Sequence, residues 1–265
     1  MISNSEYKML SALRVKLSQG RQYIIDVRRA IPQGFVGRPI VALNACEESC
    51  NKCKEVCPTG AVSLSPVSID LGKCIFCRDC VAACPAERIR FSSETQMASS
   101  TRDGLVIGRA DATPPAVEVS AALKRIFGRS LKLRSVSAGG CNGCELELNA
   151  MANVNFDFGR FGIDWVASPR HADALVLSGP LTQNMASAVS LAYAAMPDPK
   201  FVVAFGACAI SGGLYSGSEA LDREFLERFQ PSLYVPGCPP HPLTFINGLL
   251  DLLGIALPGS TRSTG

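Results

Sequence analysis

Short apolar runs alternate with longer amphipathic stretches over the second half of the chain. The apolar runs predict five strands, at Leu131–Ser137, Ile163–Ser168, Ala174–Ser178, Phe201–Phe205 and Leu233–Val235. Between and after them, apolar residues recur at helical spacing and predict helices at Gly143–Met151, Asn184–Met196, Glu219–Phe229 and Pro242–Leu253. Strands that alternate with helices build a parallel sheet covered on both faces. We therefore expect residues 131–258 to form an α/β domain with a doubly wound parallel sheet.

The first residues of the chain have a different character. Residues 1–40 carry seven Lys and Arg side chains against Glu6 and Asp26, and the stretch Glu6–Ala30 fits an amphipathic helix. We expect a basic N-terminal docking arm for a partner subunit or an anionic membrane surface. A partly helical arm that is merely solvated is the alternative.

Cysteines are concentrated between this arm and the predicted sheet. Residues 41–97 are interpreted as a separate small domain built around them. The polar stretch Ser92–Pro115 is typical of a linker, and Ala116–Arg129 fits a helix, so residues 98–130 are interpreted as linker and helix. Residues 259–265 are expected to be a tail.

Composition narrows the function classes. The chain has 265 residues, of which 47% are apolar and 18% charged, and its net charge of +3 is too small to indicate nucleic acid. No apolar run approaches the ~18–20 residues that span a bilayer. The N-terminus has neither a secretory nor a twin-arginine signal, so we expect a cytoplasmic protein. In that reducing compartment, clustered cysteines are metal ligands more often than disulfides.

Eight of the twelve cysteines form a duplicated motif. Its halves are Cys46-x3-Cys50-x2-Cys53-x3-Cys57-Pro58 and Cys74-x2-Cys77-x2-Cys80-x3-Cys84-Pro85. In such motifs three closely spaced thiolates bind one cubane, and the fourth, before proline, ligates the other cluster. We predict a first cysteine set and a second cysteine set, each holding one [4Fe–4S] cluster: Cys46, Cys50, Cys53 and Cys84 for the first, and Cys57, Cys74, Cys77 and Cys80 for the second.

Two alternatives apply to this motif. Zinc also binds paired Cys-x2-Cys groups, but it explains neither the cysteine triplets nor the two Cys-Pro endings. The x3 spacing between Cys46 and Cys50 departs from the usual x2. It predicts a larger loop around the first cluster, with a three-iron or damaged site as the alternative.

The remaining four cysteines follow predicted strands. Cys141 and Cys144 follow the first strand of the sheet, Cys208 follows the fourth and Cys238 the fifth. Ligands of open α/β sheets bind beyond the carboxyl ends of the strands. These four residues, the third cysteine set, are predicted to hold a third [4Fe–4S] cluster, with adjacent glycines that let the backbone approach it.

Several segments around these cysteines resemble one known family. The segments Gly139–Glu145, Ser168–Asp173, Ser178–Thr182, Gly206–Ala209 and Pro236–Pro240 are similar to the small subunit of [NiFe]-hydrogenases and its counterpart in respiratory complex I. The resemblance covers about residues 131–254 and implies a flavodoxin-like sheet. It also implies that the cluster of the third cysteine set is the one nearest a catalytic large subunit. The segments Phe35–Pro39 and Asp70–Cys77 look like the two-cluster ferredoxin subunits of complex I and formate hydrogenlyase. This resemblance implies a small α+β two-cluster ferredoxin domain over residues 41–97.

The spacing of the first pair in the third set separates the branches of this family. Complex I members have adjacent cysteines there, whereas Cys141-x2-Cys144 is the hydrogenase arrangement. The resemblance thus implies an electron-transfer subunit of a formate-hydrogenlyase-type complex, peripheral on the inner face of the membrane. It implies as partners a hydrogenase-type large subunit, membrane subunits and an upstream electron donor such as a formate dehydrogenase. A complex I-like oxidoreductase without hydrogenase activity and a redox-sensing regulatory subunit are the alternatives.

Four other residues are weaker candidates, and none is assigned a catalytic role. Glu145 and Glu147 fit either a large-subunit contact or proton delivery, or ordinary acidic residues in a first helical turn. His171 is interpreted as structural, and His241 either donates to a cluster sulfur or lies on the turn before the last helix. No nucleotide-binding glycine motif is present.

Overall fold

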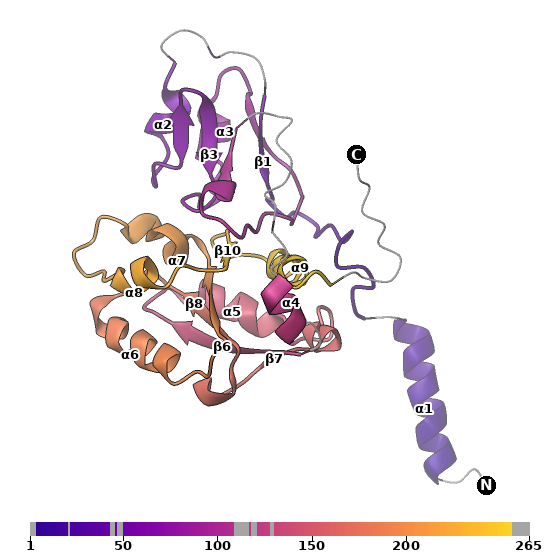
Figure 1. Cartoon of the computed structure of the whole chain (residues 1–265). Coiled ribbons are helices and arrows are strands. Elements are labelled where there is room, and N and C mark those ends of the chain that lie inside the picture. The colour runs from indigo at the N-terminus through magenta and orange to yellow at the C-terminus, as the bar shows by residue number, and fades with distance from the viewer. Residues whose placement is uncertain are drawn as a thin grey trace.

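The protein is described from a computed structural model, which places residues 4–20, 22–42, 46, 50–108, 117, 121–127 and 130–255. The described chain forms an N-terminal module (residues 38–108) and a C-terminal module (residues 130–255), with helix α1 extending away from both (Figure 1).

The five predicted strands form one parallel sheet in the C-terminal module, in the order β10-β9-β8-β6-β7. The strands are β6 (Leu131–Ser137), β7 (Ile163–Trp165), β8 (Ala174–Ser178), β9 (Phe201–Phe205) and β10 (Leu233–Val235). The register pairs Leu133 with Trp165 of β7 and with Ala174 of β8. The chain therefore starts in the middle of the sheet, adds β7 on one side and continues outward on the other to β10. This is the flavodoxin-like strand order, and the predicted fold class is confirmed.

Helices cover both faces of this sheet (Figure 1). One face carries α4 (Ala121–Phe127), α5 (Gly143–Ala150) and α9 (Pro242–Leu252); the other carries α6 (Gln183–Ala194) and α8 (Glu224–Arg228). In β8, Ala174 and Val176 pack against the first group, whereas Leu175 and Leu177 pack against the second. Alternate residues of a strand point to opposite faces, so a strand buried on both faces is apolar at every position.

The described residues of the N-terminal module form two small antiparallel sheets and two short α-helices. Strands β1 (Pro39–Val41) and β4 (Ile89–Phe91) pair, as do β2 (Val62–Leu64), β3 (Val67–Asp70) and β5 (Val106–Ile107), and the helices are α2 (Lys52–Glu55) and α3 (Asp79–Ala83). Its core combines apolar side chains such as Ile69 and Ile89 with Cys53, Cys74 and Cys80. These three cysteines thus belong to the packed interior of the module, whereas Cys77 is exposed.

Part of the predicted linker is an ordered element. Strand β5 extends the sheet of the N-terminal module, with Ile107 paired to Ile69. Just before it, Ser99 and Tyr234 of β10 exchange two backbone hydrogen bonds of 2.8 and 3.0 Å. The prediction of a linker over Ser92–Pro115 is therefore wrong for the described part of that stretch, since it belongs to both modules.

The two modules share a buried core. Leu71, Leu105 and Met97 from the N-terminal side are at most 1% exposed and pack with side chains of the C-terminal module, among them Ile210 and Tyr234. Burial of this kind stabilises by about 1.5–3 kcal/mol per large side chain. The modules are therefore fixed to each other rather than tethered.

The N-terminal arm divides into two parts. Helix α1 spans Asn4–Gln19 and ends at Gly20, whose φ of 64° is the left-handed conformation that closes helices. The predicted helix over Glu6–Ala30 is thus too long. Beyond it, Val27 is fully buried in the core of the C-terminal module, and Arg28 forms a 2.7 Å ion pair with Asp251.

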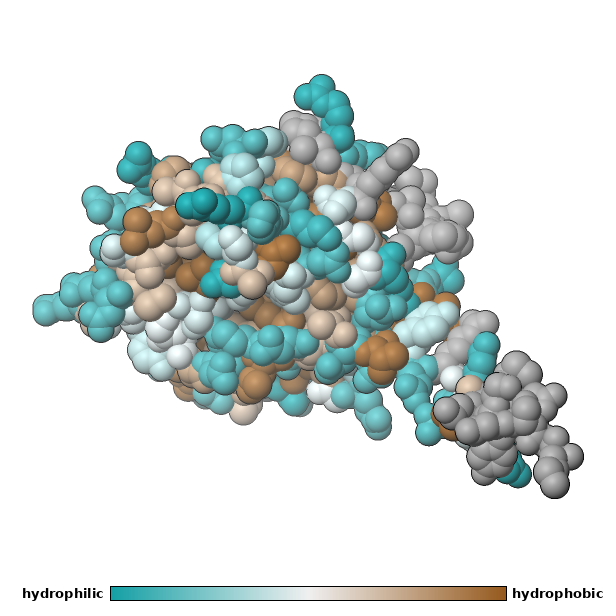
Figure 2. All heavy atoms as spheres, turned by 90° about the horizontal axis from the view of Figure 1, so that it is seen from below, coloured by the Kyte–Doolittle hydropathy of each residue, from teal (hydrophilic) through white to brown (hydrophobic). Residues whose placement is uncertain are grey.

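The surface is mixed in character. Figure 2 shows hydrophobic and hydrophilic residues interspersed over the face seen from below. On α1, Leu10, Leu13, Val15 and Leu17 are between 49% and 84% exposed. No helix in the described ranges is long and apolar enough to span a bilayer. Remaining short elements are α7 (Ala207–Ser211), η1 (Asp103–Leu105), η2 (Phe158–Phe161), η3 (Pro169–His171) and η4 (Gly213–Tyr215).

Candidate metal centres

The third cysteine set comes together at the carboxyl edge of the parallel sheet. Cys141 lies between β6 and α5, and Cys144 lies in the first turn of α5. Cys208 lies in the first turn of α7 after β9, and Cys238 follows β10. All four line one cavity of about 70 Å³, which has mainly apolar walls. The side chains of Cys141 and Cys238 are exposed, so this cavity opens to the outside of the chain.

Burial and mutual repulsion disfavour ionisation of these thiols. Burial raises the pKa of Cys208 to about 11, with further increases from the neighbouring Cys238 and Cys141. Burial also raises the pKa of Cys144 strongly, followed by the charges of Glu145 and of the other three thiols. Thiols with raised pKa values keep their protons until a metal cation replaces them, so metal binding at this site is coupled to proton release.

One glycine makes the close approach of the backbone possible. Gly206 connects β9 to α7 with φ 91° and ψ 158°, a region used almost only by glycine. A Cβ at this position would lie 2.8 Å from Cys144 Sγ, well inside van der Waals contact. Gly206 therefore leaves the space in which the thiol of Cys144 sits.

Glu145 forms part of the wall of the same cavity. Ser178 Oγ donates a 2.6 Å hydrogen bond to its Oε1, and Oε2 is buried. Burial alone would raise the pKa of Glu145, but hydrogen bonds from Ser178 and Ser137 outweigh it and lower the pKa. Burial raises the pKa of Glu147. The charge of Glu145 also raises the pKa of Cys144, so this carboxylate lies close to the thiol, which supports a role at the site.

A half-buried arginine fixes the short helix that carries Cys208. Arg223 donates to the carbonyl oxygens of Cys208, Ala209 and Ile210 at 3.2, 2.7 and 3.1 Å, and to that of Pro180 at 3.1 Å. The guanidinium thus satisfies carbonyls at the C-terminal end of α7, which an isolated helix leaves unpaired. Its charge lowers the pKa of Cys208, against the stronger effect of burial. No motif in the sequence marks this residue.

The second cysteine set also surrounds one cavity. Cys57, Cys74, Cys77 and Cys80 line it together. Burial raises the pKa of Cys74 to about 12 and that of Cys80 to about 11, and neighbouring thiols of the same set raise both further. Backbone N–H groups point at the sulfurs, from Ala61 to Cys57 at 3.2 Å and from Phe76 to Cys74 at 3.4 Å.

The four thiols of the first cysteine set also lie near one another. Burial raises the pKa of Cys53, and the charges of Cys84, Cys46 and Cys50 raise it further, so these four thiols are close to one another. The backbone N–H of Arg88 donates to Cys84 Sγ at 3.3 Å. Residues 43–45 and 47–49, which include the extra residue of the x3 spacing, lie outside the described ranges.

The arrangement of all three sets fits iron–sulfur clusters. Within the described residues, no three His, Cys, Asp or Glu side chains converge closely enough to hold a single metal ion. In the second and third sets the thiols instead surround a cavity, which is what a cluster of several atoms needs. Donor type agrees, since four thiolates are the usual ligands of [4Fe–4S] clusters. That each set holds a cluster stays a prediction.

The two histidines lie outside the cysteine sets. His171 is exposed at the end of η3. His241 caps α9, because its Nδ1 accepts a 3.1 Å hydrogen bond from the backbone N–H of Leu243. Its ring packs on Phe35 and Phe156, with centroids 5.1 and 5.6 Å away, and burial lowers its pKa. Of the two interpretations of His241, the structure supports the turn before the last helix.

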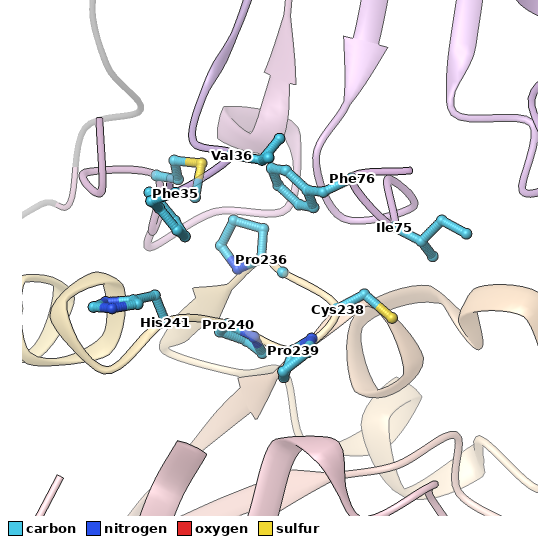
Figure 3. Close-up of a pocket in the computed structure, with 11 residues that line it drawn as sticks. Phe35, Val36, Ile75, Phe76, Pro236, Cys238, Pro239, Pro240 and His241 are labelled. Atoms are coloured by element: carbon cyan, nitrogen blue, oxygen red, sulfur yellow. The ribbon is translucent and has the colours of Figure 1, made fainter. Parts of the chain in front are cut away.

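A cavity of about 220 Å³ separates the loops of the second and third sets. Figure 3 shows Ile75 and Phe76, which follow Cys74, on the side of the N-terminal module, and Pro239 and Cys238 on the opposite side. The loop that follows Cys74 therefore faces the loop that carries Cys238 across the junction between the modules.

Comparison with known proteins matches both modules. A model of the family described as NADH ubiquinone oxidoreductase, 20 Kd subunit, matches residues 141–252, and a 4Fe-4S dicluster domain model matches residues 38–85. The probable membrane-bound hydrogenase subunit mbhJ of Pyrococcus furiosus is 40% identical over 131 residues, which are 49% of this chain and 78% of mbhJ.

Two further relatives are matched over about half of their own length. Formate hydrogenlyase subunit 7 of Escherichia coli is 39% identical over 137 residues, 52% of this chain and 54% of that protein. NAD(P)H-quinone oxidoreductase subunit K of Prochlorococcus marinus is 41% identical over 110 residues, 41% of this chain and 46% of that protein. The chain therefore belongs to the NADH ubiquinone oxidoreductase 20 Kd subunit family and carries a 4Fe-4S dicluster domain ahead of the family's own domain.

Proposed function

We propose that this chain is the electron-transfer subunit of a membrane-associated, multi-subunit [NiFe]-hydrogenase of the formate-hydrogenlyase type. It would hold three [4Fe–4S] clusters and relay electrons to or from an active site in a partner large subunit. The observation that carries the proposal is the third cysteine set, four thiols around one cavity at the carboxyl edge of the sheet. Its membrane association would come through partner subunits.

The spacing of the first cysteine pair favours a hydrogenase. Asn142 and Gly143 separate Cys141 from Cys144, and Asn142 has a φ of 70° that turns the chain between the two thiols. The relatives named as hydrogenase and hydrogenlyase subunits support the same choice. The subunit K relative favours the second candidate, a complex I-like oxidoreductase in which the same three cysteine sets serve a different acceptor.

The order of the cysteine sets supports a linear path. The thiols of the first and second sets influence each other, since the charge of Cys53 raises the pKa of Cys80, after the larger effect of burial. The loop that follows Cys74 faces the loop that carries Cys238 across the cavity between the modules. A [4Fe–4S] cluster supplies one-electron transfer, and the chain's task is to hold the three sets close and in this order.

The residues around the third set support its position next to the large subunit. Its cavity is open on the side of Cys141 and Cys238, where a partner would exclude water. Leu146, two residues after Cys144 on α5, is 62% exposed and fits a buried interface in an assembly. Glu145 would hold a negative charge there, given its lowered pKa.

Metal analysis of the intact complex tests the proposal. The complex would be isolated anaerobically through a tag on this chain, and iron and nickel would be measured together. The proposal predicts at least about twelve irons per chain, four for each cysteine set, and about one nickel per complex. Full iron without nickel in an intact complex would overturn the hydrogenase assignment and favour the complex I-like candidate. Iron near zero would overturn both.

A further inference from the structure

Gly72 and Ile210 meet at the junction between the modules. Gly72 lies two residues before Cys74 of the second set, and Ile210 two residues after Cys208 of the third. A Cβ on Gly72 would be 2.7 Å from Ile210 Cγ2 and 2.9 Å from Arg102 Cζ. The φ of Gly72 is outside the left-handed region, so only lack of space, and not backbone conformation, demands glycine here.

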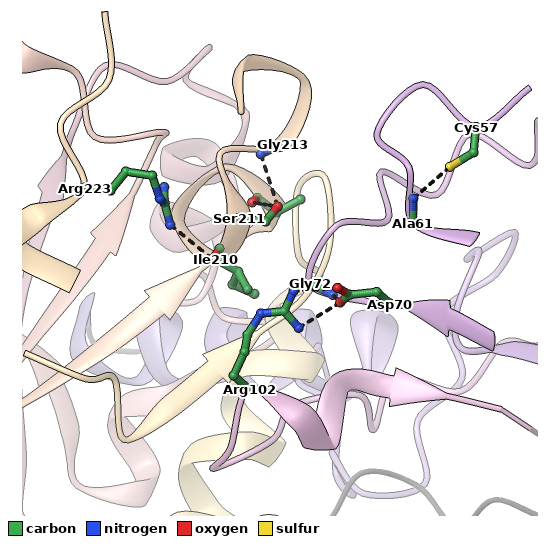
Figure 4. A network of polar contacts seen from close by, with 10 residues as sticks. Cys57, Ala61, Asp70, Gly72, Arg102, Ile210, Ser211, Gly213 and Arg223 are labelled. Carbon is green, nitrogen blue, oxygen red and sulfur yellow. Dashed lines mark hydrogen bonds and ion pairs between the residues drawn. The ribbon is translucent and has the colours of Figure 1, made fainter. Parts of the chain in front are cut away.

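An ion pair holds the N-terminal side of this contact. Arg102 binds Asp70 through two hydrogen bonds of 2.8 and 2.6 Å, and the side chains are 32% and 17% exposed (Figure 4). Asp70 in turn orders the loop of the second set, because its Oδ1 accepts from Gly72 N and its carbonyl accepts from Cys74 N, both at 2.9 Å. Arg102 is therefore fixed against Gly72 by the turn that positions Cys74.

Arg223 holds the opposite side. Its guanidinium binds the carbonyl oxygens of Ala209 and Ile210 at the end of α7, at 2.7 and 3.1 Å. Figure 4 shows Arg102 with Asp70 on one side of Ile210 and Arg223 on the other. Ile210 itself is 8% exposed and belongs to the core shared by the modules. Arg102 is held by its ion pair with Asp70, and the backbone of Ile210 is held by Arg223, so displacing either side strains a partly buried polar interaction.

We propose that the contact between Gly72 and Ile210, clamped by Arg102, is the spacer that sets the separation of the second and third cysteine sets. Gly72, Arg102 and Ile210 are then positioning residues for electron transfer between the two sets, a step that slows steeply with distance. This inference rests on the proposed function, because it needs a cluster in each set.

The test enlarges the spacer by one carbon. In Gly72→Ala, the new Cβ must move from 2.7 Å to ordinary contact at ~3.5 Å, which displaces the two sides by about 0.8 Å. The double variant Gly72→Ala/Ile210→Ala removes Cγ2, the nearest atom, and leaves the Arg102 guanidinium as the close neighbour of the new Cβ, so it relieves the contact between the modules. Gly108→Ala is the matched control, since its Cβ would meet only Val67 O, at 4.0 Å.

Each complex would be examined for iron content, for the EPR signals of the reduced clusters and their mutual magnetic interaction, and for the rate of electron transfer between the second and third sets. We expect full iron in all variants. Gly72→Ala should show a weaker magnetic interaction between the clusters and severalfold slower electron transfer. Both quantities should return toward the wild-type values in the double variant, and Gly108→Ala should have the wild-type values.

An unchanged interaction and rate in Gly72→Ala at full iron would overturn the inference. Iron loss from the second set that Ile210→Ala does not restore would also overturn it, because Gly72 would then serve cluster retention. Wild-type complex lacking the three cluster signals would instead contradict the proposed function.

Discussion

Replacing Gly206 by alanine should remove the third cluster and leave the other two. The new Cβ would start 2.8 Å from Cys144 Sγ, so the thiol must move by about 0.7 Å to reach ordinary contact at ~3.5 Å. Metal–ligand distances tolerate only about 0.2 Å. The backbone adds strain of ~1–3 kcal/mol, because φ 91° and ψ 158° suit glycine almost alone.

Iron content and EPR spectroscopy of the purified chain measure this effect. Iron should fall from about twelve to about eight per chain, with loss of one cluster signal. Two controls separate backbone strain from the clash with the thiol. Gly34→Ala tests strain alone, since φ is 71° and no atom lies within 4 Å. Gly217→Ala tests neither, since its φ is ordinary and the space is open. Both should keep full iron. Twelve irons and a wild-type spectrum in Gly206→Ala would refute the assignment of Cys144 to a cluster.

Three further predictions concern ligand assignment, charge and protonation. Cys57→Ser and Cys77→Ser should abolish the same EPR signal, whereas Cys84→Ser abolishes a different one; loss of one signal in all three would contradict the crossed assignment. Arg223→Met should lower the free energy of unfolding by ~3 kcal/mol in a denaturant titration, because several carbonyl oxygens lose a charged donor. It should also lower the midpoint potential of the third cluster, because the site loses a positive charge. Arg223→Lys, which retains the charge, should leave that potential close to the wild-type value. Since burial lowers the pKa of His241, the unfolded chain binds its proton more readily, and stability should fall as pH drops through about 6.5. Calorimetry over this pH range should show that the stability of His241→Asn, which keeps a helix-capping oxygen, depends less on pH than that of the wild type. Equal slopes of stability against pH in the two proteins would exclude His241 as the cause.

The strands of the C-terminal module were predictable because burial on both faces makes them continuous apolar runs. Ala174–Ser178 and Phe201–Phe205 have the predicted bounds for this reason. The cysteine sets were predictable from spacing together with the rule that parallel strands end at one edge. Helix α8, in contrast, is confined to Glu224–Arg228 within the longer predicted stretch Glu219–Phe229.

Features that depend on contacts between distant segments left no pattern in the sequence. Strand β5 has two residues, too few for a visible alternation, and is defined by its pairing with β3. Arg223 is one arginine outside any motif, and its role arises from carbonyls brought to it by α7. The contact of Gly72 with Ile210 joins positions far apart in the chain, so neither residue alone suggests it.

Reduction by hydrogen is the most direct test of the central claim. The complex, purified anaerobically in its oxidised form, would be exposed to H2 while the absorbance and EPR signals of its clusters are followed. The account predicts that H2 reduces the clusters of the first and second cysteine sets in the wild type, and that Cys238→Ser, which lacks one ligand of the third set, prevents this at unchanged nickel content. Clusters that stay oxidised under H2 in an intact, nickel-containing complex, or that are reduced equally in Cys238→Ser, would contradict it.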